Sequence, residues 1–274
     1  MPIAHVNNCE LYFQSAGDGE PLVFIHGETH STELFEGQFR HFSPRFRCFA
    51  YDRRGHAKSS VPLYGYSLWN QTHDLRCLLD FAGINRAVIV AVAMSTTIGA
   101  SFALQYPERV RALVLSSWYE LDGFPLLEAR RKAHQMSFAD LHLKMGEVLR
   151  ERGRAGLEDF LEDNYTTLLP IFPPDKPQVR RKLVEIFACH TAEHYIQSAE
   201  FYTSIPNVRS QMHRIECPVL GICGTEDPSP DRPELLGDVK GFRQAWVQGA
   251  RRFSMMEYPA EFNAILDEFL ASVP

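Results

Sequence analysis

The chain has 274 residues, of which 45% are hydrophobic and 23% charged, so it is neither disordered nor fibrous. Its 28 basic and 34 acidic side chains give a net charge of −6, which leaves no global field for phosphates and argues against a nucleic-acid partner. The longest apolar run, Ala87 to Met94, is far shorter than the roughly 20 residues of a membrane span, and the N-terminus has no signal-peptide pattern. We therefore expect a soluble, cytoplasmic protein without a membrane partner.

The cysteines are scattered, and none forms a C-x-x-C pair. A disulfide framework belongs to short, cysteine-dense secreted chains, so we expect reduced thiols at Cys9, Cys48, Cys77, Cys189, Cys217 and Cys223. The sequence has neither the paired Cys/His spacing of a zinc site nor a carboxylate-rich calcium loop. We expect no metal and no cofactor.

Short apolar runs alternate with longer amphipathic stretches along most of the chain. The first two runs, Ile3 to Val6 and Glu10 to Phe13, predict an antiparallel hairpin at a sheet edge. Six buried strands are then predicted at Pro21 to His26, Phe46 to Tyr51, Arg86 to Val92, Arg111 to Ser116, Pro218 to Cys223 and Arg243 to Val247. Helices are predicted at Ser31 to Phe42, Ser67 to Ala82, Thr97 to Tyr106 and Ala260 to Leu270. This alternation is typical of an α/β fold with a mainly parallel sheet between two helical layers.

The alternation is interrupted once, between residues 119 and 214. This region has helical patterns with charge on one face and no convincing strand. We interpret it as a helical cap inserted into a core made of residues 1–118 and 215–274.

The clearest functional signal surrounds Ser95. A buried strand ends in small residues, the serine follows, and a helix begins at once, which is the setting of a nucleophile elbow. The usual G-x-S-x-G is matched here as Ala93-Met94-Ser95-Thr96-Thr97, in which alanine replaces the first glycine acceptably and the β-branched Thr97 replaces the second poorly. The pattern is weak on its own, because a serine that caps a helix gives the same sequence.

Three further segments follow predicted strands or the elbow helix in a characteristic order. They are His26-Gly27-Glu28-Thr29, Tyr51-Asp52-Arg53-Arg54-Gly55-His56-Ala57-Lys58-Ser59 and Tyr106-Pro107-Glu108-Arg109-Val110. With the elbow, these segments resemble the α/β-hydrolase fold superfamily, and more narrowly its esterase, haloperoxidase and C–C hydrolase branch. The resemblance covers nearly the whole chain and includes the place where the family inserts a helical cap. It implies an eight-stranded, mostly parallel sheet flanked by helices.

The resemblance also implies roles for individual residues. Ser95 would be the nucleophile, and the backbone N–H groups of Glu28 and Thr96 would form an oxyanion hole. The segment Cys223-Gly224-Thr225-Glu226-Asp227 matches the family's G-x-x-D, so Asp227 would orient the catalytic base. A glutamate side chain at position 28 would oppose a developing oxyanion if it faced the site.

The position of the family's catalytic histidine is occupied by Arg252. The flanking segment, from Gln248 to Phe262, matches the family, and the chain has no histidine after His213. A guanidinium stays protonated at neutral pH and cannot accept a proton from serine. Arg252 would instead pair with Asp227 near Ser95 at the cleft floor, or hold an anionic substrate.

Two questions stay open on the sequence alone. One is the base, for which His30 beside the oxyanion turn and the pair His190 and His194 on an expected cap helix are candidates. The other is the reaction. The chain would be a hydrolase-like enzyme for a small ester or carbonyl compound, a lyase, cyclase or cofactor-free oxygenase, or a silent ligand-binding protein. Each predicts a small-molecule partner that is apolar or anionic, and none fixes the oligomeric state.

Overall fold

The computed structural model describes residues 2–118, 121, 138–203, 205–228 and 233–273. Its eight strands form one sheet: β1 (Ile3–Val6), β2 (Cys9–Ala16), β3 (Glu20–Ile25), β4 (Phe46–Tyr51), β5 (Ala87–Val92), β6 (Val110–Ser116), β7 (Val219–Gly224) and β8 (Arg243–Val247). The strand order is β1-β2-β4-β3-β5-β6-β7-β8, with antiparallel pairing only at β1–β2 and β2–β4. This confirms the predicted edge hairpin and the mostly parallel sheet of the α/β-hydrolase fold.

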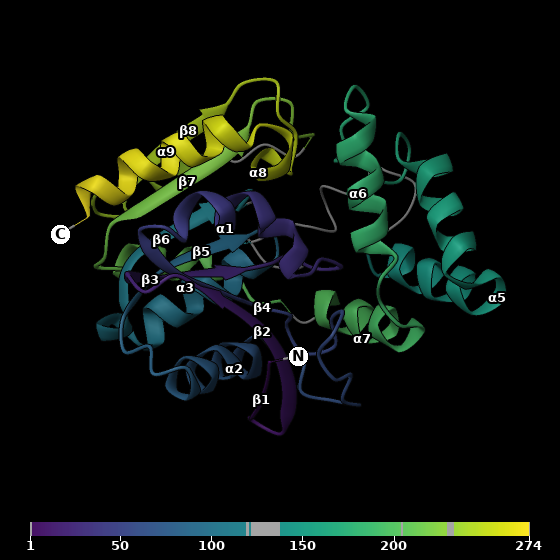
Figure 1. Cartoon of the computed structure of the whole chain (residues 1–274), viewed down its shortest axis with the longest axis horizontal. Helices are drawn as coiled ribbons and strands as arrows, with labels where there is room; N and C mark the ends of the chain where they lie inside the picture. Colours follow the sequence, from purple (N-terminus) through teal and green to yellow (C-terminus); the bar gives the residue numbers. More distant parts are fainter. Residues whose placement is uncertain (1, 119–120, 122–137, 204, 229–232, 274) are drawn as a thin grey trace.

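Helices cover both faces of the sheet (Figure 1). One layer is made of α2 (Leu68–Phe81) and α3 (Ser95–Gln105), and the other of α1 (Glu36–Phe42), α8 (Ser254–Glu257) and α9 (Pro259–Ser272). Short 3₁₀ turns lie at η1 (Thr32–Phe35), η2 (Pro107–Arg109), η4 (Arg209–Arg214) and η5 (Pro233–Leu236). Because both faces are covered, the central strand β5 is apolar and buried at every position.

Three further helices lie to one side of the sheet (Figure 1): α5 (Phe138–Asn164), which kinks at Gly153, α6 (Pro177–Phe187) and α7 (Ala192–Thr203). They fall in the segment expected to form a cap. Residues 119–120, 122–137 and 204 of that segment lie outside the described residues, so the division into core and cap at residues 119 and 214 stays a prediction.

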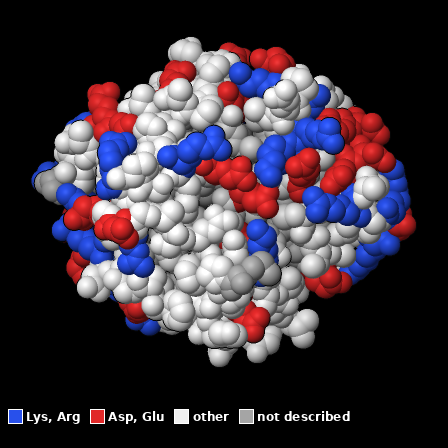
Figure 2. Space-filling view, viewed as in Figure 1, with Lys and Arg blue, Asp and Glu red and all other residues white. Residues whose placement is uncertain are grey.

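The surface carries both charge signs interspersed over the face shown in Figure 2. All six cysteines are free thiols, as predicted. Within the described ranges, the model has no helix that combines the length and apolar character needed to cross a membrane.

Candidate active site

The turn after β5 is the centre of the candidate site. The strand ends at Val92, and Ala93 at the apex adopts φ 51°, a left-handed backbone conformation that a non-glycine residue adopts only under tertiary constraint. Met94 follows, and α3 begins at Ser95. The residue that this sharp turn presents is therefore Ala93, and the prediction that Ser95 occupies the apex is wrong.

Ser95 lies beneath the turn and is fully buried. Its Oγ is 2.6 Å from the carbonyl oxygen of Ile25 and 3.0 Å from that of Val92, and it accepts a 2.9 Å hydrogen bond from the Val92 N–H. The physical reason is that the chain has already entered the first turn of α3 at this residue, so the hydroxyl reaches back to the strand ends. In this arrangement the serine ties β3 to β5 by hydrogen bonds to backbone.

The turn after β3 lies next to this elbow. A Cβ added at Gly27 would come within 3.0 Å of the Val92 carbonyl oxygen, so the close approach of the two turns requires glycine. The backbone N–H of Thr96 donates a 2.9 Å hydrogen bond to the Ala93 carbonyl inside the turn. It is therefore not available as an oxyanion donor, and the prediction for Thr96 is wrong. Within the described residues, the N–H groups of Glu28 and Met94 have no acceptor. Both N–H groups lie at the ends of the adjoining strands β3 and β5.

Asp227 and Arg252 form the buried ion pair that the sequence led us to expect. Arg252 donates from Nε to Oδ2 at 3.0 Å and from Nη2 to Oδ1 at 2.8 Å, a bidentate geometry. The side chains are 0% and 3% exposed, respectively, and the Ser117 hydroxyl adds a 3.3 Å hydrogen bond to Asp227. The pair locks the loop after β7 to the loop after β8. The hydroxyl of Ser95 forms its hydrogen bonds with Ile25 and Val92 instead.

The loop that carries Arg252 is held by Glu257 of α8. Its carboxylate accepts from the N–H groups on either side of Arg252, from Arg251 at 3.0 Å and from Phe253 at 3.1 Å. Burial raises the pKa of Glu257 to about 7 in spite of these two hydrogen bonds. The backbone around Arg252 is thus fixed by a carboxyl group that titrates near neutrality.

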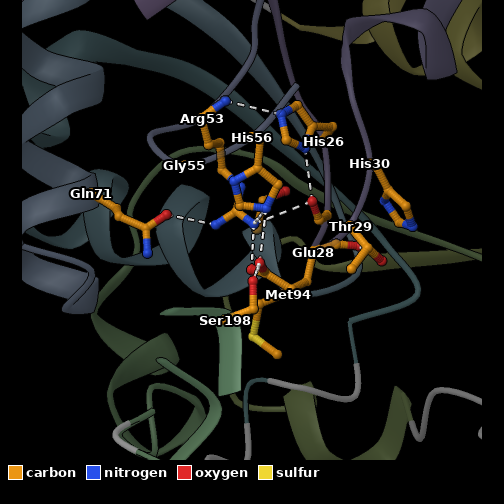
Figure 3. Close-up of polar contacts among 12 residues, drawn as sticks. His26, Glu28, Thr29, His30, Arg53, Gly55, His56, Gln71, Met94 and Ser198 are labelled. Carbon is orange, nitrogen blue, oxygen red and sulfur yellow. Dashed lines mark hydrogen bonds and ion pairs between the residues drawn. The ribbon is translucent and has the colours of Figure 1, made fainter. Parts of the chain in front are cut away.

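The side chain of Glu28 turns into a buried polar network (Figure 3). Its Oε2 accepts from Arg53 Nη2 at 2.6 Å, and its Oε1 accepts from the Ser198 hydroxyl of α7 at 2.6 Å and lies 2.8 Å from His56 Nε2. Burial opposes ionisation of Glu28, but the His56 ring and the Arg53 guanidinium hold its pKa well below the usual range. The carboxylate is therefore charged and internally neutralised.

The three histidines predicted as alternative bases are all buried, and burial lowers the pKa of each well below its usual value, to about 3 for His190. His194 lies in the first turn of α7, whereas His190 precedes that helix, so the two do not share a helical face as predicted. Their rings nevertheless stack with centroids 4.1 Å apart. His190 and His194 contact backbone carbonyls through their ring nitrogens.

His30 differs from the other two. Its ring packs against Phe187 of α6 and Phe253 beside Arg252, with centroids 5.2 Å and 5.1 Å away. A Cβ at Gly27 would lie 2.8 Å from its Nδ1, which places the imidazole directly beside the turn after β3. Within the described residues, Nδ1 has no hydrogen-bond partner. Of the predicted bases, His30 is the one with a buried, unused ring nitrogen at the elbow.

Sequence reasoning missed Ala93, Met94 and Ser198. The signal for the first two was present, because the apolar strand ends at Val92 and an elbow residue follows its strand directly. The observed apex, Ala93, therefore lies two residues before Ser95. Ser198 had no local signal, since its partner Glu28 is 170 residues away in the sequence.

The sheet has eight strands in this order, a sharp turn at the end of β5 and Asp227 in the loop after β7, which together are typical of the α/β-hydrolase fold. The family model of the alpha/beta hydrolase fold matches residues 20–169, more than half of the chain. The chain belongs to the α/β-hydrolase family.

Individual relatives agree with that assignment. The chain is 26% identical over 273 residues to 3-oxoadipate enol-lactonase 2 of Acinetobacter baylyi, covering 96% of each protein. It has the fold of the enol-lactonase from Burkholderia xenovorans LB400, with a TM-score of 0.79, 22% identity and coverage of 98% of this chain and 100% of that one. An esterase from Exiguobacterium antarcticum gives a TM-score of 0.78 at 18% identity, with 97% of each chain covered.

Proposed function

We propose that the protein is an enzyme that acts on a small ester or related carbonyl compound and forms no covalent intermediate at the elbow. The observation that carries this proposal is the apex residue, because the methyl group of Ala93 cannot attack a carbonyl carbon. The backbone donors of Glu28 and Met94 remain available to a carbonyl oxygen. The relationship to an enol-lactonase supports a carbonyl compound as the substrate class.

In the proposed reaction, the two backbone N–H groups stabilise the negative charge that develops on the carbonyl oxygen. Such donors contribute on the order of 10² to 10³ in rate each, because they are fixed in place before the charge appears. A water molecule would be the nucleophile, since Ala93 offers no hydroxyl group. The side chain of Glu28 does not oppose the oxyanion, because it faces Arg53, His56 and Ser198 instead.

His30 is the proposed general base. A buried imidazole with a lowered pKa is neutral at pH 7 and keeps a lone pair for a proton. Water would attack the carbonyl carbon as His30 takes its proton, and the tetrahedral oxyanion would then collapse. The bond from carbon to the leaving oxygen would break, and that oxygen would receive the proton from His30.

The Asp227–Arg252 pair is assigned a positioning role. Two hydrogen bonds join the side chains, and Arg252 stays protonated, so neither group is assigned as a base for the elbow. The pair holds the loop in which Phe253 packs against His30. In this proposal His30 is the general base, the role that the histidine of a serine triad has in the loop after the last strand.

The test is turnover of a panel of small esters and lactones by the full chain and by His30→Gln. We expect turnover that a fluorophosphonate does not block, and a loss on the order of 10² to 10⁴ in kcat in the variant. His73→Gln on α2 is the matched control and should leave kcat unchanged. Covalent labelling of Ser95 or Ser198 that abolishes turnover would replace this mechanism by a serine route.

A silent ligand-binding protein is the second candidate, favoured by the buried ion pair that Arg252 forms with Asp227 at the position of the family's catalytic histidine. It predicts saturable binding of the same compounds with no product formed. A lyase or cyclase would use the same donors to stabilise an enolate, and it would be recognised by a product that contains no added water. Product analysis by mass spectrometry in ¹⁸O-labelled water therefore separates the three candidate functions: hydrolysis adds labelled oxygen, a lyase or cyclase adds none, and a binding protein forms no product.

A further inference from the structure

The turn after β3 carries the backbone N–H of Glu28, and its own sequence does not fix the direction of that N–H group. Gly27 has no side chain, so its backbone tolerates either orientation of the peptide that joins it to Glu28. Thr29 has φ 58°, a left-handed conformation that a β-branched residue rarely adopts. Contacts from outside the turn must therefore hold this backbone in place.

Arg53, in the loop after β4, makes several of these contacts (Figure 3). Its side chain is buried, and its Nη1 donates to Gln71 Oε1 on α2 at 2.6 Å, which holds the guanidinium in place. Its Nη2 donates to the Gly27 carbonyl at 3.2 Å and to Glu28 Oε2 at 2.6 Å, and it lies 3.0 Å from His56 Nε2. A single nitrogen therefore contacts both the carbonyl that precedes Glu28 and the side chain of Glu28 itself.

The backbone of Arg53 also determines the tautomer of His26. Its N–H donates to His26 Nε2 at 2.9 Å, and since a backbone N–H can only donate, that ring nitrogen carries the lone pair. Burial lowers the pKa of His26 well below its usual value, so the ring is neutral and its single proton lies on Nδ1. This nitrogen is 2.7 Å from the Gly27 carbonyl oxygen and donates to it. The carbonyl thus accepts from both the His26 ring and the Arg53 guanidinium.

The direction of this carbonyl determines the direction of the neighbouring N–H. In a trans peptide the C=O and N–H bonds are coplanar and point in opposite directions. The Gly27 carbonyl and the Glu28 N–H belong to one such peptide, so two donors on the carbonyl direct the N–H away from Arg53. A flipped peptide would point the N–H at the guanidinium, which cannot accept a hydrogen bond.

We propose that the Arg53 side chain is a positioning residue for the oxyanion donor, because it holds the Gly27–Glu28 peptide with its N–H directed away from the guanidinium and available to a substrate. This inference rests on the proposed function, in which that N–H stabilises the negative charge on a carbonyl oxygen. Arg53 supports the same charge in a second way, since its 2.6 Å ion pair neutralises the buried Glu28 carboxylate. An unpaired carboxylate beside the turn would repel a developing oxyanion.

The first test is a set of crystal structures of the full chain, of Arg53→Met and of the double variant Arg53→Met, Glu28→Gln. Methionine fills the space without a donor, and the double variant avoids the lone buried carboxylate that could unfold the protein. We expect the Gly27–Glu28 peptide to flip, or to occupy both orientations, in these variants. Arg47→Met is the matched control and should keep the native peptide, because Arg47 donates to the Ala82 carbonyl at 2.9 Å from the other end of β4.

The second test is turnover of small esters by the same proteins, with circular dichroism to confirm that each is folded. One fixed donor contributes on the order of 10² to 10³ in rate, and His26 still contacts the carbonyl, so kcat should fall by about 10- to 100-fold while KM changes by less than about twofold. Arg53→Lys keeps the charge without the planar fork of donors and should recover only part of the loss. A native peptide orientation in both Arg53→Met proteins overturns the proposal, whatever their kcat. An inactive native chain contradicts the proposed function instead, and the peptide orientation then still decides whether Arg53 holds the turn.

Discussion

The ion pair between Asp227 and Arg252 gives the strongest stability prediction. Both side chains are almost completely buried, and two charged hydrogen bonds of 2.8 and 3.0 Å join them. In Arg252→Ala the carboxylate loses both of these bonds and keeps the 3.3 Å hydrogen bond from the Ser117 hydroxyl. Removing one member of a buried pair costs about 3–5 kcal/mol, because the other charge stays desolvated. That is a large part of the roughly 5–15 kcal/mol that stabilises a typical domain.

Urea unfolding followed by circular dichroism measures this cost. The double variant Asp227→Leu, Arg252→Met removes both charges and should recover most of the loss, since hydrophobic replacement of a buried pair is often neutral. Arg154→Ala breaks the exposed pair with Glu158 and should cost less than about 1 kcal/mol. If Arg252→Ala costs no more than Arg154→Ala, or the double variant is as unstable as the single one, the reasoning from burial is refuted.

Three further predictions concern the elbow and its supporting loop. The double variant Ala93→Ser, Arg252→His should acquire fluorophosphonate labelling at position 93, because Asp227 can orient the new imidazole, whereas Arg252→His alone should acquire none. Ser95→Ala should lower the free energy of unfolding by about 1–3 kcal/mol and leave kcat unchanged, because its hydroxyl satisfies buried backbone groups. The folded pKa of Glu257 is about 7 against 4.5 for a free glutamate, so its contribution favours folding as the pH falls from 7 to 4.5 and is lost above 7. Urea unfolding across this range should show that trend, and Glu257→Gln should flatten it.

Each of these predictions has a result that contradicts it. Labelling in the single variant Arg252→His would mean that a serine already serves as nucleophile. A kcat that falls with Ser95→Ala at unchanged stability would give that serine a catalytic part. If Glu257→Gln keeps the full pH dependence of the free energy of unfolding, a group other than Glu257 causes that dependence.

The fold was largely predictable because its signals are local. The apolar strand at Ala87–Val92 and the hairpin at Ile3–Val6 follow from hydrophobic patterning within a few residues. The pairing of Asp227 with Arg252 was also within reach, since both lie on loops after strands that meet at one sheet edge. The start of α3 and the apex of the elbow, by contrast, were each predicted two residues too late, at Thr97 and Ser95 instead of Ser95 and Ala93. A shift of two residues is enough to move the Ser95 side chain from the expected apex to the space beneath it.

The histidine network was not predictable, because its contacts depend on the tertiary fold. His194 reaches the carbonyl of Gly55 across 139 residues, and Ser198 reaches Glu28 across 170. The residues next to His194 and Ser198 in the sequence give no sign that these polar side chains are buried. The glutamate was noticed only as a charge misplaced beside an oxyanion turn.

Glu28 connects the two halves of the site. Its backbone N–H is a free donor beside the elbow, while its side chain is held by Arg53 and His56 of the loop after β4 and by Ser198 of α7. Any displacement of α7 from the sheet domain must either break the Ser198 hydrogen bond or pull on the turn that carries this donor. A buried charged hydrogen bond contributes about 1.5–3 kcal/mol, so the packing of α7 against the sheet domain and the conformation of the turn after β3 stabilise each other. The Glu28 side chain, which seemed out of place in the sequence, thus couples α7 to the turn that carries the proposed oxyanion donor.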